Sequence, residues 1–369
     1  MQSSQTTVLK EKVAPKKQFL EDIIKAVPEV AEGIRNTDQL IKQSLILTPK
    51  HPMQKVVDYV TGEGKNLRVL MPLLLSIGYT RNSNHNTEAV AGLTQIVHEF
   101  SKVMDDRIDN ASKRHNKDTV HVKFGTWASE TLNGIQDGAM ERIKSTIDDV
   151  YKTTFSDVWG DFLVEISEGE AEDVLMECGG RDDELWKEHS YFRATSDIAT
   201  LPTFKQYFSM IDKKTGSMLR ASFGLAVELS GGTLEDIDNA TTFGHYFGRI
   251  HQITDDYLDI YSEESEKKLG GDILSHKLGN YVLLTLLRSD EVETKDKDDL
   301  LSFIKQGNEN MLGEALKICN DYKHVVDKDY KQMMTGLENK TNMIINTMKD
   351  ERIKSILPKF IHEYIYRKV

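Results

Sequence analysis

Apolar residues recur three and four positions apart along most of the chain, which is the period of an α-helix and not of a β-strand. The pattern begins with Phe19, Ile23 and Val27, and Pro28 then predicts a break between two helices. Pairs of glycine or proline separate the later segments and predict interhelical turns. These pairs are Pro49 with Pro52, Gly62 with Gly64, Gly179 with Gly180, Gly231 with Gly232, and Gly270 with Gly271. The pattern predicts an all-α protein.

Length and composition favour one domain with a short tail. The chain has 369 residues, and no shift in composition along it indicates a second domain. Residues 1–17 have no apolar stretch of signal-peptide length, so we expect a flexible tail there and a single helical domain at 18–369. Apolar runs such as 69–77 are shorter than the roughly 18 residues of a transmembrane helix, so no membrane-spanning segment is expected.

Charge and cysteine content limit the partners and the compartment. The 47 basic and 59 acidic residues give a net charge of -12, which argues against nucleic acid as a partner. The two cysteines, Cys178 and Cys319, provide neither a disulfide framework nor the spacing of a zinc site. This indicates a reducing compartment, and we expect a cytoplasmic protein.

A first cluster of aspartates closes a stripe of apolar residues with helical spacing. Asp105 and Asp109 lie one above the other on a helix face, with Asp106 beside them. Negative charge at a helix C-terminus is unfavourable, so a cation should offset it, and Mg²⁺ prefers such hard oxygen ligands. Taken alone, however, an exposed acidic helix end explains such a cluster more often than a metal site does.

A second cluster of the same construction follows another apolar helical stripe. Asp255, Asp256 and Asp259 repeat the spacing of two adjacent aspartates, two other residues and a third aspartate. Six carboxylates facing each other would repel strongly and would need several divalent cations. Magnesium ions between two carboxylate walls would hold a diphosphate and stabilise it as a leaving group. The two clusters together predict the ionisation of a diphosphate ester.

Basic residues provide a candidate second anion site. Lys65 and Arg68 stand at the start of a helix that should run to about Ser76, where free backbone N–H groups favour a diphosphate. In isolation they would be a solvated basic pair. His98 precedes Asp105 by seven residues and shares nearly the same helix face. On its own it would more often be a core histidine, but its position near the aspartates favours a binding function.

These motifs together resemble the trans-isoprenyl diphosphate synthases, the farnesyl and geranylgeranyl diphosphate synthase group, from about Phe19 to the C-terminus. Further matches are the Lys-Thr pair, the Gln before the second cluster and the lysines around Asp272. The resemblance implies that the catalytic residues are Asp105, Asp106, Asp109, Lys214, Gln252, Asp255 and Asp256. It implies that the metal ligands are Asp105, Asp106, Asp109, Asp255, Asp256 and Asp259. It implies substrate binding by Lys65, Arg68, His98, Arg114, Lys214, Thr215, Gln252, Lys268 and Lys277.

The resemblance also implies a fold and a reaction. The fold would be an isoprenoid synthase-type bundle of ten or more helices around a central cavity, usually assembled as a homodimer. The enzyme would be a prenyltransferase that uses several Mg²⁺ ions, for which Mn²⁺ can substitute. It would condense isopentenyl diphosphate with an allylic diphosphate (dimethylallyl, geranyl or farnesyl) to make a short-chain all-trans prenyl diphosphate.

Two departures from the family pattern keep other functions open. The paired arginines after the first cluster are Arg114 and His115 here, and the Phe before Gln252 is His251. His115 favours a terpene cyclase derived from such a synthase, which would need no isopentenyl diphosphate site. The complete basic site and the second aspartate motif argue against a cyclase. A noncatalytic partner subunit is disfavoured because both clusters are complete.

The product length should depend on Phe100 and Ser101, since in the family the residues just before the first motif limit the growing tail. At about 1.5 Å per residue, Phe100 lies roughly 7.5 Å along the helix from Asp105, where it can be a cavity floor. Ser101 leaves space where farnesyl-producing members of the animal type carry a second aromatic ring. We therefore expect geranylgeranyl diphosphate, with farnesyl diphosphate and the C25 product as the neighbouring alternatives.

Overall fold

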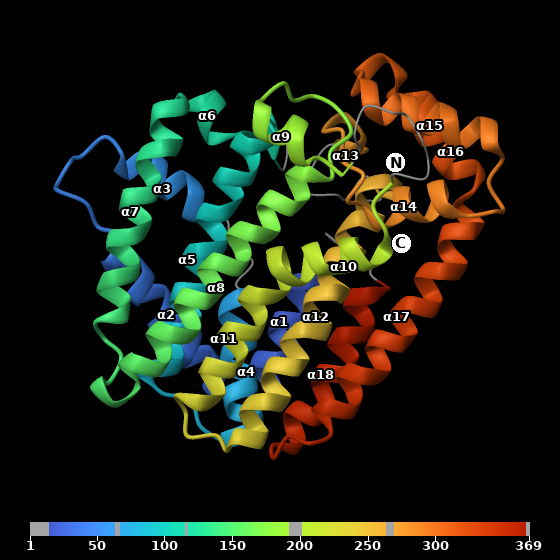
Figure 1. Ribbon diagram of the computed structural model, residues 1–369. Helices are drawn as coiled ribbons and strands as arrows, with labels where there is room; N and C mark the ends of the chain where they lie inside the picture. Colours follow the sequence, from blue (N-terminus) through green and yellow to red (C-terminus); the bar gives the residue numbers. More distant parts are fainter. Residues whose placement is uncertain (1–14, 63–66, 115–116, 192–200, 263–268, 367–369) are drawn as a thin grey trace, which may run out of the picture.

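The computed structural model describes residues 15–62, 67–114, 117–191, 201–262 and 269–366, and it is built almost entirely of helices (Figure 1). The α-helices are α1 (Pro15–Ala26), α2 (Glu29–Ser44), α3 (Gln54–Thr61), α4 (Leu67–Thr80), α5 (His85–Ile108), α6 (Val120–Lys123), α7 (Thr126–Lys144), α8 (Lys152–Leu175), α9 (Glu184–His189), α10 (Phe204–Ile211), α11 (Ser217–Glu228), α12 (Leu234–Tyr261), α13 (Gly271–Leu274), α14 (Tyr281–Arg288), α15 (Thr294–Gln306), α16 (Leu312–Asp321), α17 (Lys323–Ile345) and α18 (Glu351–Ile365). The shorter elements are η1 (Asp149–Tyr151), η3 (Asp212–Gly216), η4 (Glu309–Met311) and the antiparallel strands β1 (Lys113–Arg114) and β2 (Lys117–Asp118). The all-α prediction is confirmed.

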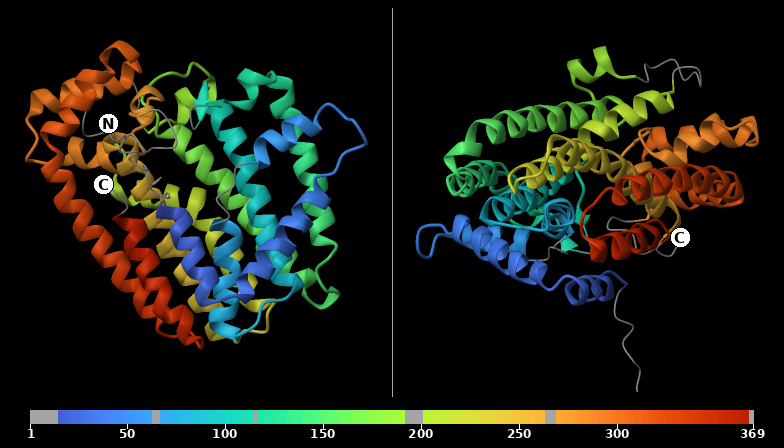
Figure 2. Two further views of the ribbon diagram at one scale, coloured as in Figure 1. Left: turned by 180° about the vertical axis from the view of Figure 1, so that it is seen from behind. Right: turned by 90° about the horizontal axis from the view of Figure 1, so that it is seen from below.

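The central helices are α4, α5 and α11, which pack against one another, and α12, which packs on α11. Helices α2 and α7 cover α5, α8 packs on α11, and α17 and α18 lie along α12 (Figures 1 and 2). Helices α5 and α12 both run upward in Figure 1, so their C-terminal ends lie on the same side of the bundle. The two aspartate clusters stand at these ends.

Local signals in the sequence explain where the helices begin and end. Helix α1 ends at Ala26 and α2 begins at Glu29, as Pro28 predicted. Gly231, whose φ is 90°, makes the turn before α12, and Thr233 then forms a capping box with Asp236. Helix α1 begins within residues 1–17, and the boundary between tail and domain stays a prediction.

The interior is apolar along whole faces of the central helices. In α4 every residue from Val69 to Tyr79 is buried, which explains the long apolar run in the sequence. Helix α12 buries Phe243, Phe247 and Ile250 on one side. None of the helices in the described ranges is both long enough and apolar enough to cross a bilayer.

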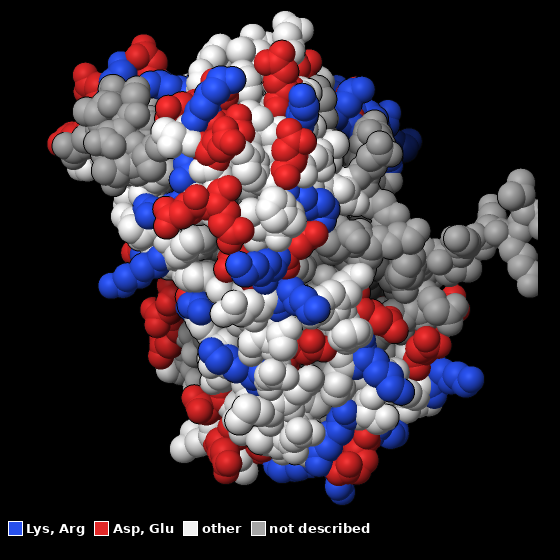
Figure 3. All heavy atoms as spheres, turned by 90° about the vertical axis from the view of Figure 1, so that its right-hand side faces the viewer, with Lys and Arg blue, Asp and Glu red and all other residues white. Residues whose placement is uncertain are grey.

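The face that contains α17 mixes the two signs of charge (Figure 3). Lys328 pairs with Glu291 at 3.2 Å, and Lys323 pairs with Asp327 at 2.8 Å on the next turn of the same helix. Basic and acidic side chains alternate over the visible surface. The negative net charge of the chain is therefore not gathered on this face.

Candidate active site

The first aspartate cluster lies at the end of α5 and contacts Arg114 of β1. The Arg114 guanidinium Nη2 is 2.8 Å from Asp105 Oδ2 and also 2.8 Å from Asp106 Oδ1. The hairpin of β1 and β2 follows α5 directly, so this arginine folds back over the helix end. Arg114 thus supplies part of the positive charge that the cluster requires at a helix C-terminus.

Lys214 brings a second cation to the same cluster from η3. Its Nζ lies 3.0 Å from Asp105 Oδ1, 2.9 Å from Glu170 Oε2 and 2.7 Å from Asp173 Oδ2. Burial would lower the pKa of Lys214, but the surrounding carboxylates, Asp105 first, outweigh burial and raise this pKa well above the usual lysine value. The ammonium group therefore stays charged in the interior.

Lys277, which precedes α14, completes this group. Its Nζ lies 3.1 Å from Asp109 Oδ1 and 2.9 Å from Asp173 Oδ2. Burial would raise the pKa of Asp173, but the two lysines outweigh burial and hold this pKa below the usual range. Lys214 and Lys277, which are far apart in sequence, thus contact the same buried carboxylate, that of Asp173.

Asp173 and Glu170 of α8 are site residues that the sequence analysis missed. Both sit in the segment 165–177, which has six acidic residues. Such a dense run of acidic residues is typical of a solvated face, and no local signal separates these two from the rest. Spacings of three or four positions also join other acidic residues of this run, so helix periodicity does not single out Glu170 and Asp173.

Lys214 can reach the cluster because α8 approaches its backbone closely at a glycine. A Cβ built on Gly169 would lie 2.2 Å from the backbone nitrogen of Lys214. The lysine itself belongs to η3, a π-helical segment of five residues between α10 and α11. Such segments are rare and frequently occur at functional sites. Gly169 and the π-helical turn together place the ammonium group among the carboxylates.

The second cluster ends α12, and Asp256 is its most enclosed member. Asp256 Oδ2 accepts hydrogen bonds from Tyr207 Oη at 2.6 Å and from the Tyr281 backbone N–H at 2.8 Å. Burial, and next the nearby Asp272 carboxylate, raise the pKa of Asp256 to about 7. Tyr207 was not among the residues expected from the sequence.

The other two aspartates of this cluster point to different neighbours. Asp259 is buried and accepts hydrogen bonds from the backbone N–H groups of Gly271 and Asp272, both at 3.2 Å, at the start of α13. Asp255 is 40% exposed, and its Oδ2 lies 3.2 Å from His251 Nδ1. One turn of helix therefore presents carboxylates in several directions.

Thr215 and Gln252 link the two clusters. Thr215 Oγ1 donates to Gln252 Oε1 at 2.8 Å, and Gln252 Nε2 donates to Asp256 Oδ1 at 2.9 Å. Since Lys214 next to Thr215 contacts Asp105, two neighbouring residues of η3 reach one cluster each. The structure thus brings both aspartate motifs to a single site.

Of the remaining predicted site residues, the structure describes some and not others. Arg68 is in the first turn of α4, and its Nη2 lies 3.1 Å from His251 Nε2. His98 is partly buried on α5, and its carbonyl accepts a hydrogen bond from Ser101 Oγ at 3.1 Å. Phe100 is buried in the core. Lys65, His115 and Lys268 lie outside the described residues.

A comparison with family models identifies the family of this chain. Residues 50–336 match the family model of the polyprenyl synthetases. The chain belongs to this family. The matched range includes both aspartate clusters and the residues of η3, so the site described above lies within the family domain.

Individual relatives of this polyprenyl synthetase differ in their products. The short chain isoprenyl diphosphate synthase of Methanothermobacter thermautotrophicus is 28% identical over 330 residues, covering 85% of this chain and 90% of the relative. The geranylgeranyl diphosphate synthase of Saccharolobus solfataricus is 25% identical over 311 residues, covering 81% and 86%. The heptaprenyl diphosphate synthase structure from Staphylococcus aureus shares the fold, with a TM-score of 0.75, 20% identity, and 92% of this chain and 99% of that chain covered.

The donor set of this polyprenyl synthetase suits magnesium. Carboxylate oxygens are the ligands that Mg²⁺ prefers, and it is commonly held by one or two carboxylates together with substrate phosphates. Among the residues that the structure describes, no three His, Cys, Asp or Glu side chains are grouped to hold a metal ion alone. The carboxylates at the two helix ends would therefore need further ligands, such as phosphate oxygens, to complete the coordination of a metal ion.

Proposed function

We propose that this chain condenses isopentenyl diphosphate with an allylic diphosphate in a magnesium-dependent reaction, and that its main product is geranylgeranyl diphosphate. Family membership makes the chain a prenyltransferase, a prenyl diphosphate synthase. The observation that carries the proposal is the link through η3, in which Lys214 contacts Asp105 while Thr215 reaches Asp256 through Gln252. Two carboxylate clusters with buried cations between them suit a diphosphate that departs as an anion.

The metal ligands would be the aspartates of both clusters. These are Asp105, Asp106, Asp109, Asp255, Asp256 and Asp259. Bound magnesium would stabilise the negative charge that develops on the leaving diphosphate. Mn²⁺ should substitute, because it accepts the same oxygen ligands.

The cations of the chain would bind the allylic diphosphate and orient its reacting carbon. Arg114 offers a planar guanidinium and Lys214 a point charge to the phosphate oxygens, together with Lys268 and Lys277. The bond between the allylic carbon and the diphosphate oxygen breaks, and its electron pair leaves with the diphosphate. The terminal alkene carbon of isopentenyl diphosphate forms the new carbon–carbon bond, and a proton leaves to the released diphosphate.

Isopentenyl diphosphate would bind on the other side, at the start of α4. Arg68, with Lys65 and His98, would hold its diphosphate, since helix N-termini favour anions. A terpene cyclase is the alternative function, because it would use the same metal clusters without this site. The intact set of basic residues favours the synthase.

Phe100 and Ser101 support a product of intermediate length. Phe100 is buried about 7.5 Å along α5 from Asp105, and its ring would close the tail cavity, while the small Ser101 side chain would leave room beside it. Farnesyl diphosphate and the C25 product are the neighbouring alternatives. The proposal includes a homodimer in the cytoplasm, where Cys178 and Cys319, both free and buried, would stay reduced.

Consumption of isopentenyl diphosphate tests the proposed reaction. We would supply each allylic diphosphate in turn, with Mg²⁺ or with EDTA, and compare Asp105→Ala and Asp255→Ala with wild type. Both variants should lose at least about a hundredfold in turnover, because charge stabilisation of a leaving group is a dominant catalytic effect. Asp238→Ala, on an exposed position of α12, is the control and should turn over like wild type. Undiminished turnover of both variants in EDTA would contradict the proposal.

A further inference from the structure

A bidentate ion pair joins the first residue of the π-helical turn η3 to α12. Arg249 of α12 donates from Nε to Asp212 Oδ1 at 2.8 Å and from Nη2 to Asp212 Oδ2 at 2.7 Å. Both side chains are largely buried, with 25% of the arginine and 19% of the aspartate exposed. Two such charge-assisted bonds between a guanidinium and a carboxylate fix their relative orientation. The chain is thus held to α12 two residues before Lys214.

Further contacts hold this ion pair in place. Arg220 Nη1, from the first turn of α11, donates to the backbone carbonyl of Asp212 at 2.9 Å. The Arg249 guanidinium also lies over the Phe208 ring of α10, with its central carbon 4.9 Å from the ring centroid. Phe208 precedes η3 and Arg220 follows it, so contacts from both sides of the turn meet at the ion pair.

The orientation of η3 matters because its neighbouring residues serve different aspartate clusters. Lys214 contacts Asp105 of the first cluster, while Thr215 reaches the second cluster through Gln252. A π-helical turn contains about one residue more than an α-helical turn. Relaxation to an α-helix would therefore rotate the residues after Asp212 by roughly 100° around the helix axis. Lys214 and Thr215 could not then both reach their present partners.

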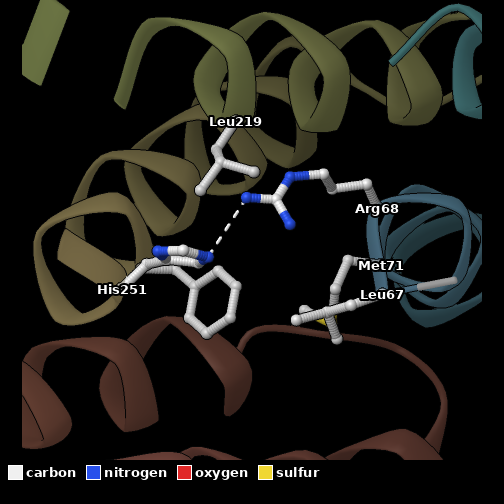
Figure 4. A pocket seen from close by; sticks show the side chains of 6 residues that line it. Leu67, Arg68, Met71, Leu219 and His251 are labelled. Atoms are coloured by element: carbon white, nitrogen blue, oxygen red, sulfur yellow. Dashed lines mark hydrogen bonds between the residues drawn. The ribbon is translucent and has the colours of Figure 1, made fainter. Parts of the chain in front are cut away.

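The other end of the turn is fixed by close backbone packing and not by charge. A Cβ built on Gly248 of α12 would lie 2.8 Å from Gly216 Cα, and one built on Gly244 would lie 2.6 Å from the Leu219 carbonyl oxygen. Leu219 lines the same small pocket as Arg68, beside the proposed isopentenyl diphosphate site (Figure 4). Loss of the ion pair should therefore release the start of η3, while Leu219 and this pocket stay in place.

We propose that Arg249 is a positioning residue that, through Asp212, holds η3 in the orientation in which Lys214 binds the allylic diphosphate. The guanidinium is directed at Asp212 and the Phe208 ring, so we expect it to act through η3 and not by contact with a substrate. The inference rests on the proposed function for the ligand of Lys214. The effect of the ion pair on η3 itself does not depend on that ligand.

Hydrogen exchange followed by mass spectrometry tests the effect on η3 without any substrate. In Arg249→Met the amide hydrogens of residues 213–216 should exchange about tenfold faster than in wild type, because a charge-assisted contact that holds the turn is lost. Arg352→Met is the matched control, since Arg352 pairs with Asp350 at the start of α18, with Nη2 2.7 Å from Oδ2. It should leave the exchange of η3 unchanged. Wild-type exchange of η3 in Arg249→Met would overturn the proposal.

Steady-state kinetics test whether Arg249 positions Lys214 for the allylic substrate. Arg249→Met should raise the KM for the allylic diphosphate about tenfold, because the phosphate contact of Lys214 is disturbed. The KM for isopentenyl diphosphate should not change, because the pocket beside Arg68 is fixed by the glycine contacts. A loss of folded protein alone would lower kcat without separating the two KM values. Equal changes in both KM values, or no change in either, would overturn the positioning role.

Three further variants test whether the two residues act as a pair. Asp212→Ala and the double variant with Arg249→Met should show the same allylic KM as Arg249→Met alone, because either change breaks the same contact. Arg249→Lys keeps the charge and should give an intermediate KM. Additive effects of the two single changes would overturn the proposal, since Arg249 would then act through another partner. If wild type consumed no isopentenyl diphosphate, the proposed function would fail, while the exchange experiment would still decide whether Arg249 holds η3.

Discussion

Asp173 and Lys277 form a buried ion pair in which Oδ2 of the aspartate lies 2.9 Å from the lysine Nζ. The same oxygen lies 2.7 Å from Lys214 Nζ, so one carboxylate oxygen faces two ammonium groups. Two buried like charges this close would repel strongly without the anion between them. Asp173 therefore balances the charge of both lysines, which belong to the proposed phosphate site.

Asp173→Asn should strongly destabilise the protein, because it leaves two buried cations without their shared anion. Breaking a buried ion pair by removing one partner costs about 3–5 kcal/mol. The measurement is the free energy of unfolding in denaturant. Asp157→Asn, an exposed position of the same helix, is the control and should change it little. Equal unfolding midpoints for the two variants would show that Asp173 does not balance the lysines.

Gly169→Ala should displace η3 and lower activity, because the added Cβ would lie 2.2 Å from the Lys214 backbone nitrogen. Backbone atoms cannot move aside as a flexible side chain can, so α8 and η3 must separate. Gly160→Ala, on the same helix, is the matched control, since no atom of a neighbouring element lies within 4 Å of its added Cβ. It should be neutral or stabilise by up to about 1 kcal/mol through helix propensity. Similar melting temperatures and turnover for the two variants would refute the close approach.

Asp256→Asn should gain stability relative to wild type as the pH rises. The pKa of Asp256 is about 7 in the folded protein, above its ordinary value of 3.8. Between these pH values the folded state holds a proton that the unfolded state releases, so the contribution of this group to stability falls as the pH rises towards 7. Asparagine cannot ionise and avoids that loss.

Denaturant unfolding in EDTA at pH 5 and pH 8 measures this effect. The difference between Asp256→Asn and wild type should grow between the two pH values by on the order of 1–4 kcal/mol. Asp238→Asn, exposed on the same helix, should show no such trend. A difference for Asp256→Asn that stays constant with pH would contradict the raised pKa.

Phe100→Ala should lengthen the product, because it removes the ring proposed to close the tail cavity. The loss of a buried phenylalanine should also cost about 3–5 kcal/mol of stability. Phe155 is also a fully buried ring, but it lies on α8. Phe155→Ala is therefore the control for the loss of stability and should leave the product unchanged. Mass analysis of the products of the folded variants decides the matter. If Phe100→Ala gave the wild-type distribution, a different helix would set the product length.

The sequence was sufficient to predict the helices and the positions of the aspartates on them. Apolar periodicity, Pro28 and the glycine pairs are local signals, and they located the end of α1 and the starts of α2 and α12. The spacing within each aspartate cluster likewise depends on one helix alone. The resemblance then supplied Arg114, Lys214 and Gln252, which the structure brings to the clusters.

Contacts between distant segments could not be predicted in this way. The pairing of Asp173 with Lys277 joins residues more than a hundred positions apart. In the sequence, Asp173 cannot be distinguished from the other acidic residues of the segment 165–177. The contact of Arg68 with His251 joins residues 183 positions apart. Such pairs depend on how α4, α8 and α12 pack, and the periodicity of a single helix contains no information about that packing.

The product of one incubation tests the central claim most directly. We would incubate the purified chain with Mg²⁺, isopentenyl diphosphate and one allylic diphosphate at a time: dimethylallyl, geranyl or farnesyl diphosphate. The products would be identified by mass spectrometry after dephosphorylation. The account predicts a linear C20 alcohol, with one isopentenyl diphosphate consumed for every five carbons added. Cyclic hydrocarbons formed from an allylic diphosphate alone, with isopentenyl diphosphate left unconsumed, would contradict it.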